Sequence, residues 1–294
     1  MKHHLIIWAS GVIFLIYISN AAAQQTMDST LFNIETSDGN EFIGYILERD
    51  SILLLSTIDY GVLRIRMPFI KKISPVHMRE IVGGAYWPEN PQAARYFWAP
   101  NGYGLRAGEG YYQNVWVLFN QVSVGLTDHI SMGGGFIPLF LFDGAPTPVW
   151  ITPKISFPVV NDKFNIGGGA LLGTVVGEEE SGFGILYGSF TLGNRNNNFS
   201  TGFGYGYAGR SWAKSPVVNF SGMVRTGARG YLLSENYYIP LKDDNLVLMS
   251  FGGRQIIKKA SVDYGLFIPV SPEIDSFIVI PWLGIVFPFG NTGN

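Results

Sequence analysis

The chain has no cysteine among its 294 residues, and charged residues are few. Without cysteine it can form no disulfide bond, carry no lipid on a cysteine and build no thiolate metal site. Charged residues make up 14% of the sequence, well below the roughly 25% of typical soluble domains. The formal net charge is −2, so no basic excess points to a nucleic-acid partner. The fold must therefore be held by packing and strand pairing.

Long apolar runs are also scarce, and the one that is present lies near the N-terminus. Residues 5–18 are almost wholly apolar, follow Lys2 and precede three alanines at 21–23. A positive head, an apolar stretch and a small-x-small site are typical of a secretory signal peptide. We predict a signal peptide over 1–23, cleaved between Ala23 and Gln24, with an N-terminal anchor helix as the alternative. No later run reaches the roughly 18 apolar residues of a spanning helix.

Glycine and aromatic residues, in contrast, are abundant, with 37 glycines and 15% aromatic residues. This composition is typical of a transmembrane β-barrel, in which one strand face meets lipid and the other meets a small-residue interior. For an exported chain it predicts the cell outer membrane as the location and membrane lipid as a partner. A soluble periplasmic binding protein rich in β structure is the alternative.

Residues 24–75 are expected to form a small periplasmic β domain. Short alternating stretches between turn residues predict five strands, at 31–36, 41–49, 51–58, 61–68 and 70–73. The tripeptide Asp38-Gly39-Asn40 predicts a hairpin turn, because glycine and asparagine tolerate positive φ.

The same segment resembles the Sm-like and SH3-like small barrels. The residues that carry the resemblance are Asp38-Gly39-Asn40, Gly44, Ile46, Asp50 and Leu54, then Ile65-Arg66, Ile70 and Ile73. The resemblance implies a small, strongly bent barrel, with Gly44 at the bend of the second strand. Sm-like proteins often bind RNA; because this chain is expected to be exported, we predict a periplasmic protein partner instead.

Residues 76–93 are expected to be a linker, because Pro88 and Pro91 interrupt any regular pattern. Residues 94–294 predict an antiparallel transmembrane barrel of about twelve strands, with ten as the alternative. Most of the segments are longer than soluble strands and several alternate with a period of two. The predicted strands are 95–106, 112–126, 130–142, 149–160, 164–177, 183–193, 198–209, 215–227, 229–240, 245–257, 260–270 and 276–289. Pro100 and Gly102 interrupt the first of them, and a plug or a loop is its alternative.

Because successive antiparallel strands cross the membrane in opposite directions, their connections alternate between its two sides. The turns near 127–129, 161–163, 194–197 and 258–259 are expected on the periplasmic side, and the loops at 143–148, 178–180, 242–244 and 271–275 outside. Trp116, Trp150 and Trp212 then fall near outer strand ends, where an aromatic girdle belongs. The last segment ends near Phe289 and resembles the strand that the barrel assembly machinery reads, so this machinery is a predicted partner. Segments of 95–290 also resemble uncharacterised bacterial outer-membrane β-barrel proteins, which implies an architecture and no activity.

Five charged residues lie inside predicted strands. A charge that faces lipid costs about 2–4 kcal/mol, so these side chains are expected to face the lumen or lie at an interface. They either form an ion-pair network that plugs a narrow barrel or guide small solutes through it. The candidate lumen charges are Lys154, Arg225, Glu235, Arg254 and Asp263.

No enzyme, cofactor or metal site is predicted. A hydrolytic barrel needs a histidine within hydrogen-bond reach of a serine. His129 is close to Ser131 in sequence but falls in a predicted periplasmic turn. We therefore expect a non-enzymatic barrel, either a narrow passive channel or a structural membrane component, with a lipid-modifying enzyme as the alternative.

Overall fold

The computed structural model describes residues 30–57, 60–76, 80–82, 85–241, 244–257 and 260–290. The predicted signal peptide and its cleavage site at Ala23 and Gln24 lie outside these residues. The chain divides into two compact units, one ending at Gly84 and one beginning at Ala85. Both consist mainly of strands, and the described residues include no α-helix. The expected all-β fold is confirmed.

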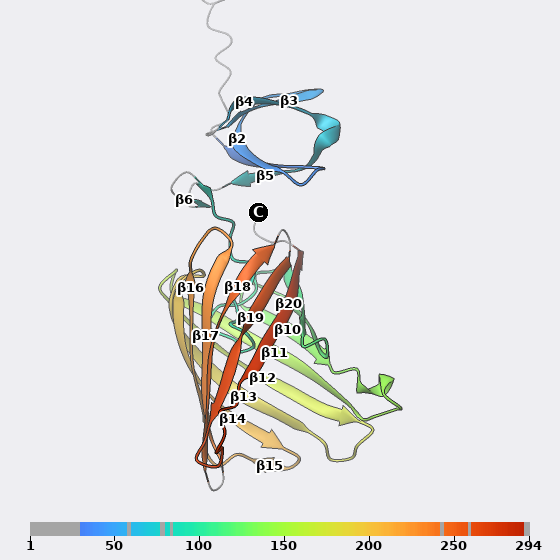
Figure 1. The fold of residues 1–294 in the computed structure, drawn as a ribbon, viewed down its shortest axis with the longest axis vertical. Helices are drawn as coiled ribbons and strands as arrows, with labels where there is room; N and C mark the ends of the chain where they lie inside the picture. Colours follow the sequence, from blue (N-terminus) through green and yellow to red (C-terminus); the bar gives the residue numbers. More distant parts are fainter. Residues whose placement is uncertain are drawn as a thin grey trace, which may run out of the picture. The chain divides into compact units, whose positions relative to one another are not determined.

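The first unit holds a strongly curved five-stranded antiparallel sheet (Figure 1). Its order is β4-β3-β2-β1-β5, so β1 pairs with both β2 and β5. Ile34, Leu53 and Leu55 are completely buried between the curled faces and form its core. The strands are β1 (Leu31–Thr36), β2 (Glu41–Arg49), β3 (Ile52–Thr57), β4 (Gly61–Arg66) and β5 (Ile70–Val76), with β6 (Ile81–Val82) and β7 (Ala85–Tyr86) at the boundary between the units.

All five predicted strands of this unit are present, with two changed ends. The strand predicted over 61–68 stops at Arg66, because Pro68 lies in a 3₁₀ turn, Met67–Phe69. The last strand runs to Val76 rather than 73. At the predicted hairpin turn Gly39 has a φ of 86°. There the Thr36 hydroxyl donates to Asp38, which lowers the pKa of that carboxyl below its usual value.

The second unit is a closed antiparallel barrel of twelve wall strands. Each strand pairs with the next wall strand, and β20 pairs with β8, so the ring has no open edge (Figure 1). The wall strands are β8 (Glu109–Val115), β9 (Phe119–Gly125), β10 (Ile130–Phe136), β11 (Thr147–Val160), β12 (Phe164–Val176), β13 (Phe183–Gly193), β14 (Asn198–Ala208), β16 (Val217–Arg225), β17 (Gly230–Pro240), β18 (Asn245–Ile257), β19 (Ala260–Val270) and β20 (Ile280–Gly290); β15 (Ser211–Trp212) pairs only with the end of β14, and a 3₁₀ turn, η3, spans Leu139–Leu141.

The number of wall strands matches the prediction, but three segments differ from it. Residues 95–106 form no wall strand, and the segment predicted over 112–126 is two strands, β8 and β9. Their turn contains Trp116 and Val117 at φ values of 51° and 67°, conformations that glycine or asparagine normally supplies. Neither residue is present at 116–118, so no turn signal marks this position in the sequence. The segment predicted over 130–142 leaves the wall after Phe136, just before Pro138.

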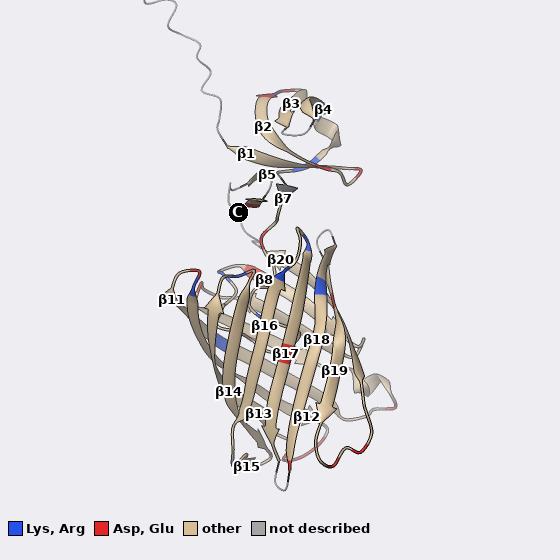
Figure 2. Ribbon diagram, turned by 60° about the vertical axis from the view of Figure 1, so that its left-hand side comes forward, with Lys and Arg blue, Asp and Glu red and all other residues tan. Residues whose placement is uncertain are grey.

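Side chains alternate between a small or polar interior and an apolar exterior along the wall. On β11, Ile151 and Ile155 are exposed while Lys154 and Ser156 are buried. The same alternation is present on β20, where Trp282 and Val286 point inward. Figure 2 shows few charged residues on the wall, with most of the coloured segments near its two ends. The period of two predicted from the sequence is therefore present.

The wall strands define two ends of the barrel. At the terminal end β8 begins and β20 finishes, and the connections 126–129, 161–163, 194–197 and 226–229 lie there. At the loop end lie 116–118, 137–146, 177–182, 209–216 and 271–279. Those connections that were predicted from the sequence and are fully described fall into the two expected groups.

The wall strands are shortest at β8, β9 and β10, so the wall has its smallest height there. Each of these strands has 7 residues, whereas the other wall strands have between 9 and 14. The loop-end turns beside them are apolar and exposed: Val117 is 82% and Leu141 68% exposed. One side of the barrel therefore ends in a low, apolar rim.

Gly44 provides a test of the small unit. A Cβ atom at this position would lie 2.3 Å from the backbone oxygen of Ser56 on β3. Gly44→Val should therefore separate β2 from β3 and destabilise the sheet by about 1–3 kcal/mol. Limited proteolysis of the full-length protein should show faster cleavage within 31–76 while the barrel stays intact. Val62→Thr, at an exposed position on β4, is the control; equal cleavage rates in the two variants would contradict the close approach.

Candidate functional site: the plugged lumen

Residues 90–105, called the plug here, occupy the interior of the barrel. Nearly all of them are buried, and Gln92, Tyr96, Phe97 and Asn101 are completely so. The plug folds back on itself as a hairpin. The Tyr96 amide donates to the Ala99 carbonyl at 3.0 Å, and the backbones of Arg95 and Pro100 form an isolated antiparallel β-bridge. The wall strand predicted over 95–106 is therefore wrong. The linker predicted over 76–93 also differs, since its last residues belong to the barrel unit.

The centre of the plug is held by a carboxylate shared between two arginines. Asp263 on β19 accepts from Arg254 on the neighbouring strand at 2.6 and 2.9 Å, and from Arg95 of the plug at 3.0 Å. All three side chains are at most 3% exposed. Arg254 also donates to the carbonyl oxygens of Gln92 and Tyr96. The cluster gives each buried charge a counter-ion and gives two plug carbonyl groups a hydrogen-bond donor, as buried polar groups require.

The tip of the plug is bound by Glu235 on β17. One carboxylate oxygen accepts from the amides of Trp98 and Ala99 at 2.8 and 2.9 Å. The other accepts from the Tyr237 hydroxyl at 2.7 Å. Two backbone donors in a tight turn are thereby paired, so the tip is fixed by charge-assisted hydrogen bonds.

Lys154 on β11 binds the two arms of the plug. Its ammonium group donates to the carbonyl oxygen of Ala94 at 3.1 Å and to that of Tyr103. Within the described part of the chain, no ion pair of Lys154 is found. Lys154 is thus a buried cation that is solvated by backbone carbonyl groups.

Arg225 lies elsewhere than the other four candidate charges. It is half-buried at the terminal end of β16, where it donates to the Pro88 carbonyl at 2.8 Å and stacks on Trp87 and Tyr231. The structure therefore brings Lys154, Glu235, Arg254 and Asp263 to the plug and places Arg225 at the mouth through which the plug enters. Arg254 and Asp263, which are register partners on β18 and β19, form an ion pair across strands.

Aromatic rings surround the plug tip. Phe97 packs against Phe267 and Trp282 at 5.5 and 5.7 Å between ring centroids, and Trp98 packs against Trp150 at 6.2 Å. Trp150 is 6% exposed, so it faces the lumen rather than forming part of the predicted outer girdle. Trp116 and Trp212 are exposed at the loop end, as a girdle requires.

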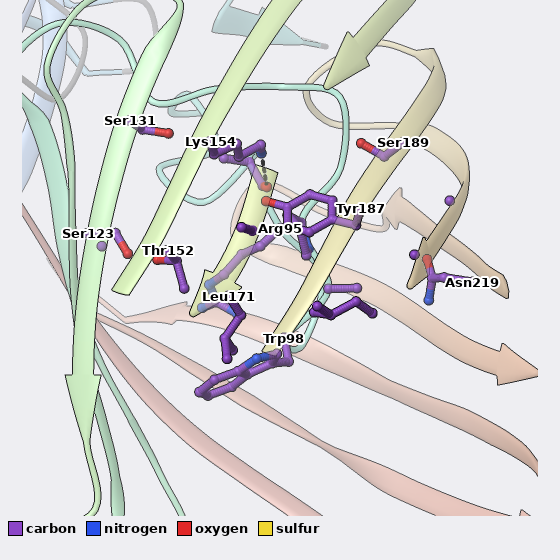
Figure 3. A pocket seen from close by; sticks show the side chains of 18 of the residues that line it. Arg95, Trp98, Ser123, Ser131, Thr152, Lys154, Leu171, Tyr187, Ser189 and Asn219 are labelled. Carbon is purple, nitrogen blue, oxygen red and sulfur yellow. Dashed lines mark hydrogen bonds between the residues drawn. The ribbon is translucent and has the colours of Figure 1, made fainter. Parts of the chain in front are cut away.

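A cavity of about 190 Å³ lies between the plug and the wall. Figure 3 shows Lys154, Arg95 and Tyr187 around it, with Trp98 and Leu171 on another side. Hydroxyl groups of β9, β10 and β11 also line the cavity, from Ser123, Ser131 and Thr152. The cavity therefore combines apolar walls with one buried basic side.

The structure does not bring His129 and Ser131 together as a pair. The His129 ring contacts the Ser156 carbonyl oxygen at 3.1 Å and stacks on Phe157, whereas Ser131 is buried and faces the lumen. Among the described residues, no three histidine or carboxylate side chains cluster as a metal site would require. No helix in those residues is long and apolar enough to cross a membrane.

The sequence offered a plug only as the alternative to a wall strand over 95–106, and sequence reasoning missed Arg95 as a site residue. The signal was the composition of 88–104, in which prolines, asparagines and glycines interrupt any alternation. The sequence matches no family model, and a search of curated proteins finds no relative.

Removing the shared carboxylate should loosen the plug and destabilise the barrel. Asp263→Ala leaves Arg95 and Arg254 as buried charges without a counter-ion, which costs about 3–5 kcal/mol. The expected result is a lower thermal midpoint of the strand circular dichroism signal in the full-length protein. Asp275→Ala, which removes a carboxylate from an exposed connection, is the matched control. Equal midpoints for both variants would show that the cluster does not anchor the plug.

Proposed function

We propose that this protein is a non-enzymatic outer-membrane β-barrel that its own plug closes to free diffusion. The observation that carries the proposal is the wall itself, which is apolar outside and binds an inserted segment through buried charges inside. The structure does not favour a narrow open channel, because the plug occupies the lumen. The proposal is therefore a closed barrel that serves as a membrane component and opens only if the plug moves.

The apolar exterior favours a membrane over water. Soluble monomers rarely expose contiguous apolar patches larger than a few hundred Å². Here large apolar side chains are exposed on eleven of the twelve wall strands, all except β8. Examples from around the ring are Val122, Ile151, Leu186, Phe199, Phe220, Phe251, Leu266 and Leu283. Lipid contact would satisfy these side chains, whereas a soluble binding protein would leave them in water.

The same proposal assigns a side to each end of the barrel. An exported chain whose small unit precedes β8 would leave that unit in the periplasm, on the side of the membrane from which β8 starts. The small unit keeps its likeness to Sm-like and SH3-like barrels, with five antiparallel strands and a 3₁₀ turn before the last one. We propose that it binds a periplasmic protein and not RNA. The aromatic end of β20, at Phe289, is the proposed signal for the barrel assembly machinery.

A charge placed on the outer face tests the membrane location. Phe251 is 66% exposed in the middle of β18, and Phe251→Lys should reduce the stability of the vesicle-inserted barrel by about 2–4 kcal/mol. Phe277→Lys, at an 82% exposed position in the loop-end connection, should have little effect. Urea titration of the protein in lipid vesicles, followed by heat-modifiable gel migration, compares them. Two equally stable variants would favour a soluble barrel.

Conductance tests whether the plug closes the barrel. The wild-type protein in planar bilayers should give no discrete steps, because the plug is anchored at its centre, tip and arms. Arg95→Ala removes the plug's cation from the Asp263 cluster and should produce brief openings. Arg210→Ala, at an exposed loop-end position, should stay silent like the wild type. Steady open steps in the wild type, or a silent Arg95→Ala variant, would contradict the proposal.

A further inference from the structure

The buried charges of the barrel do not balance. Among the described residues, the charged side chains that are at least nine-tenths buried are Arg95, Lys154, Arg254, Glu235 and Asp263. Three cations face two carboxylates, which leaves one positive charge. A buried charge without a counter-ion is costly, so this arrangement is suited to one bound anion.

Two donors at the cavity lack partners. The Lys154 ammonium carries three N–H groups, of which two are taken by the carbonyl oxygens of Ala94 and Tyr103. The Nε atom of Arg95 is buried and has no hydrogen-bond partner within the described part of the chain. Both residues line the cavity, and Figure 3 shows them on the same side of it. The third N–H of Lys154 can donate to one oxygen of an anionic group, whereas the Arg95 Nε atom is too buried to contact a molecule in the cavity and adds only its positive charge nearby.

The size and lining of the cavity limit which molecule could carry the anionic group. Its volume of about 190 Å³ is slightly larger than a cavity of ~150 Å³ that holds benzene. A lipid with two acyl chains is too large for this space. Trp98, Leu171, Ile185 and Tyr187 supply apolar walls. A short hydrocarbon chain attached to the anionic head fits both the volume and the lining.

The low rim lies beside the cavity. Gln121 and Ser123 of β9 and Ser131 and Gly133 of β10 line the cavity, and these strands have 7 residues each. The turns at the loop end of this side expose Val117 and Leu141. An amphiphile would meet apolar side chains before it reached the basic group, which favours a fatty acid over a fully polar anion.

We propose that the cavity binds a single-chain carboxylate, with its head at Lys154 and its chain against Trp98, Leu171 and Ile185. The proposal uses the barrel and the plug but not their location in a membrane. The protein would therefore act as a carrier or sensor of a short fatty acid in addition to closing its own lumen.

Quenching of tryptophan fluorescence by 8-bromooctanoate tests the proposal in full-length protein purified in a nonionic detergent. Bromine quenches an indole on contact, and Trp98 lines the cavity. The expected result is saturable quenching that Trp98→Phe removes. The uncharged 8-bromooctanol should bind about tenfold more weakly, and Lys154→Met should bind the acid no better than the alcohol.

Ser131, on the neighbouring strand β10, offers a matched pair of variants. Ser131 and Lys154 are register partners, and both face the lumen. Ser131→Asp supplies an internal carboxylate and should abolish the preference for the acid, whereas Ser131→Asn should keep it. This pair decides the question if Lys154→Met does not fold. Quenching that does not saturate, equal affinity for acid and alcohol, or unchanged acid binding in Ser131→Asp would overturn the proposal without affecting the closed-barrel proposal.

Discussion

The carboxylate of Asp263 is buried between two guanidinium groups that belong to different parts of the chain. Arg254 comes from the next wall strand and Arg95 from the plug, so one group ties the wall to the contents of the lumen. Neither arginine could remain buried without a partner, because a desolvated charge alone is very unfavourable. The rest of the interior is arranged around this requirement. Glu235 accepts hydrogen bonds from backbone amides of the plug, and Lys154 donates to its backbone carbonyl groups, so these buried groups are paired.

The filled lumen also explains the composition of the inner wall. Small residues let the plug approach closely: a Cβ atom on Gly167 would come within 3.1 Å of the Asn101 carbonyl oxygen. Larger side chains on the inner face would exclude the plug. Glycine on the inner wall therefore leaves space for the plug, while exposed apolar residues occupy the outer face of every wall strand except β8.

The wall was largely predictable from sequence, but the contacts that hold the plug in the lumen were not. Alternation along β11 and β19 identified which face of each strand carries Lys154 and Asp263, because a period of two is a local property. The role of these charges depended on Arg95, which lies 168 residues before Asp263, and no local pattern reports such a contact. The turn at Trp116 and Val117 was missed because its conformation is one that these residues rarely adopt.

The plug enters and leaves through the same mouth of the barrel. Glu89 and Arg106, which flank the plug, pair at 2.8 Å. The neighbouring residues are held at the terminal end, where Arg225 donates to the Pro88 carbonyl and the Ala107 amide donates to Asp128. A hairpin held in this way can be withdrawn as a loop without threading an end of the chain and without breaking any strand pair of the wall. Occupation of the lumen and integrity of the ring are therefore topologically independent, although one carboxylate stabilises both.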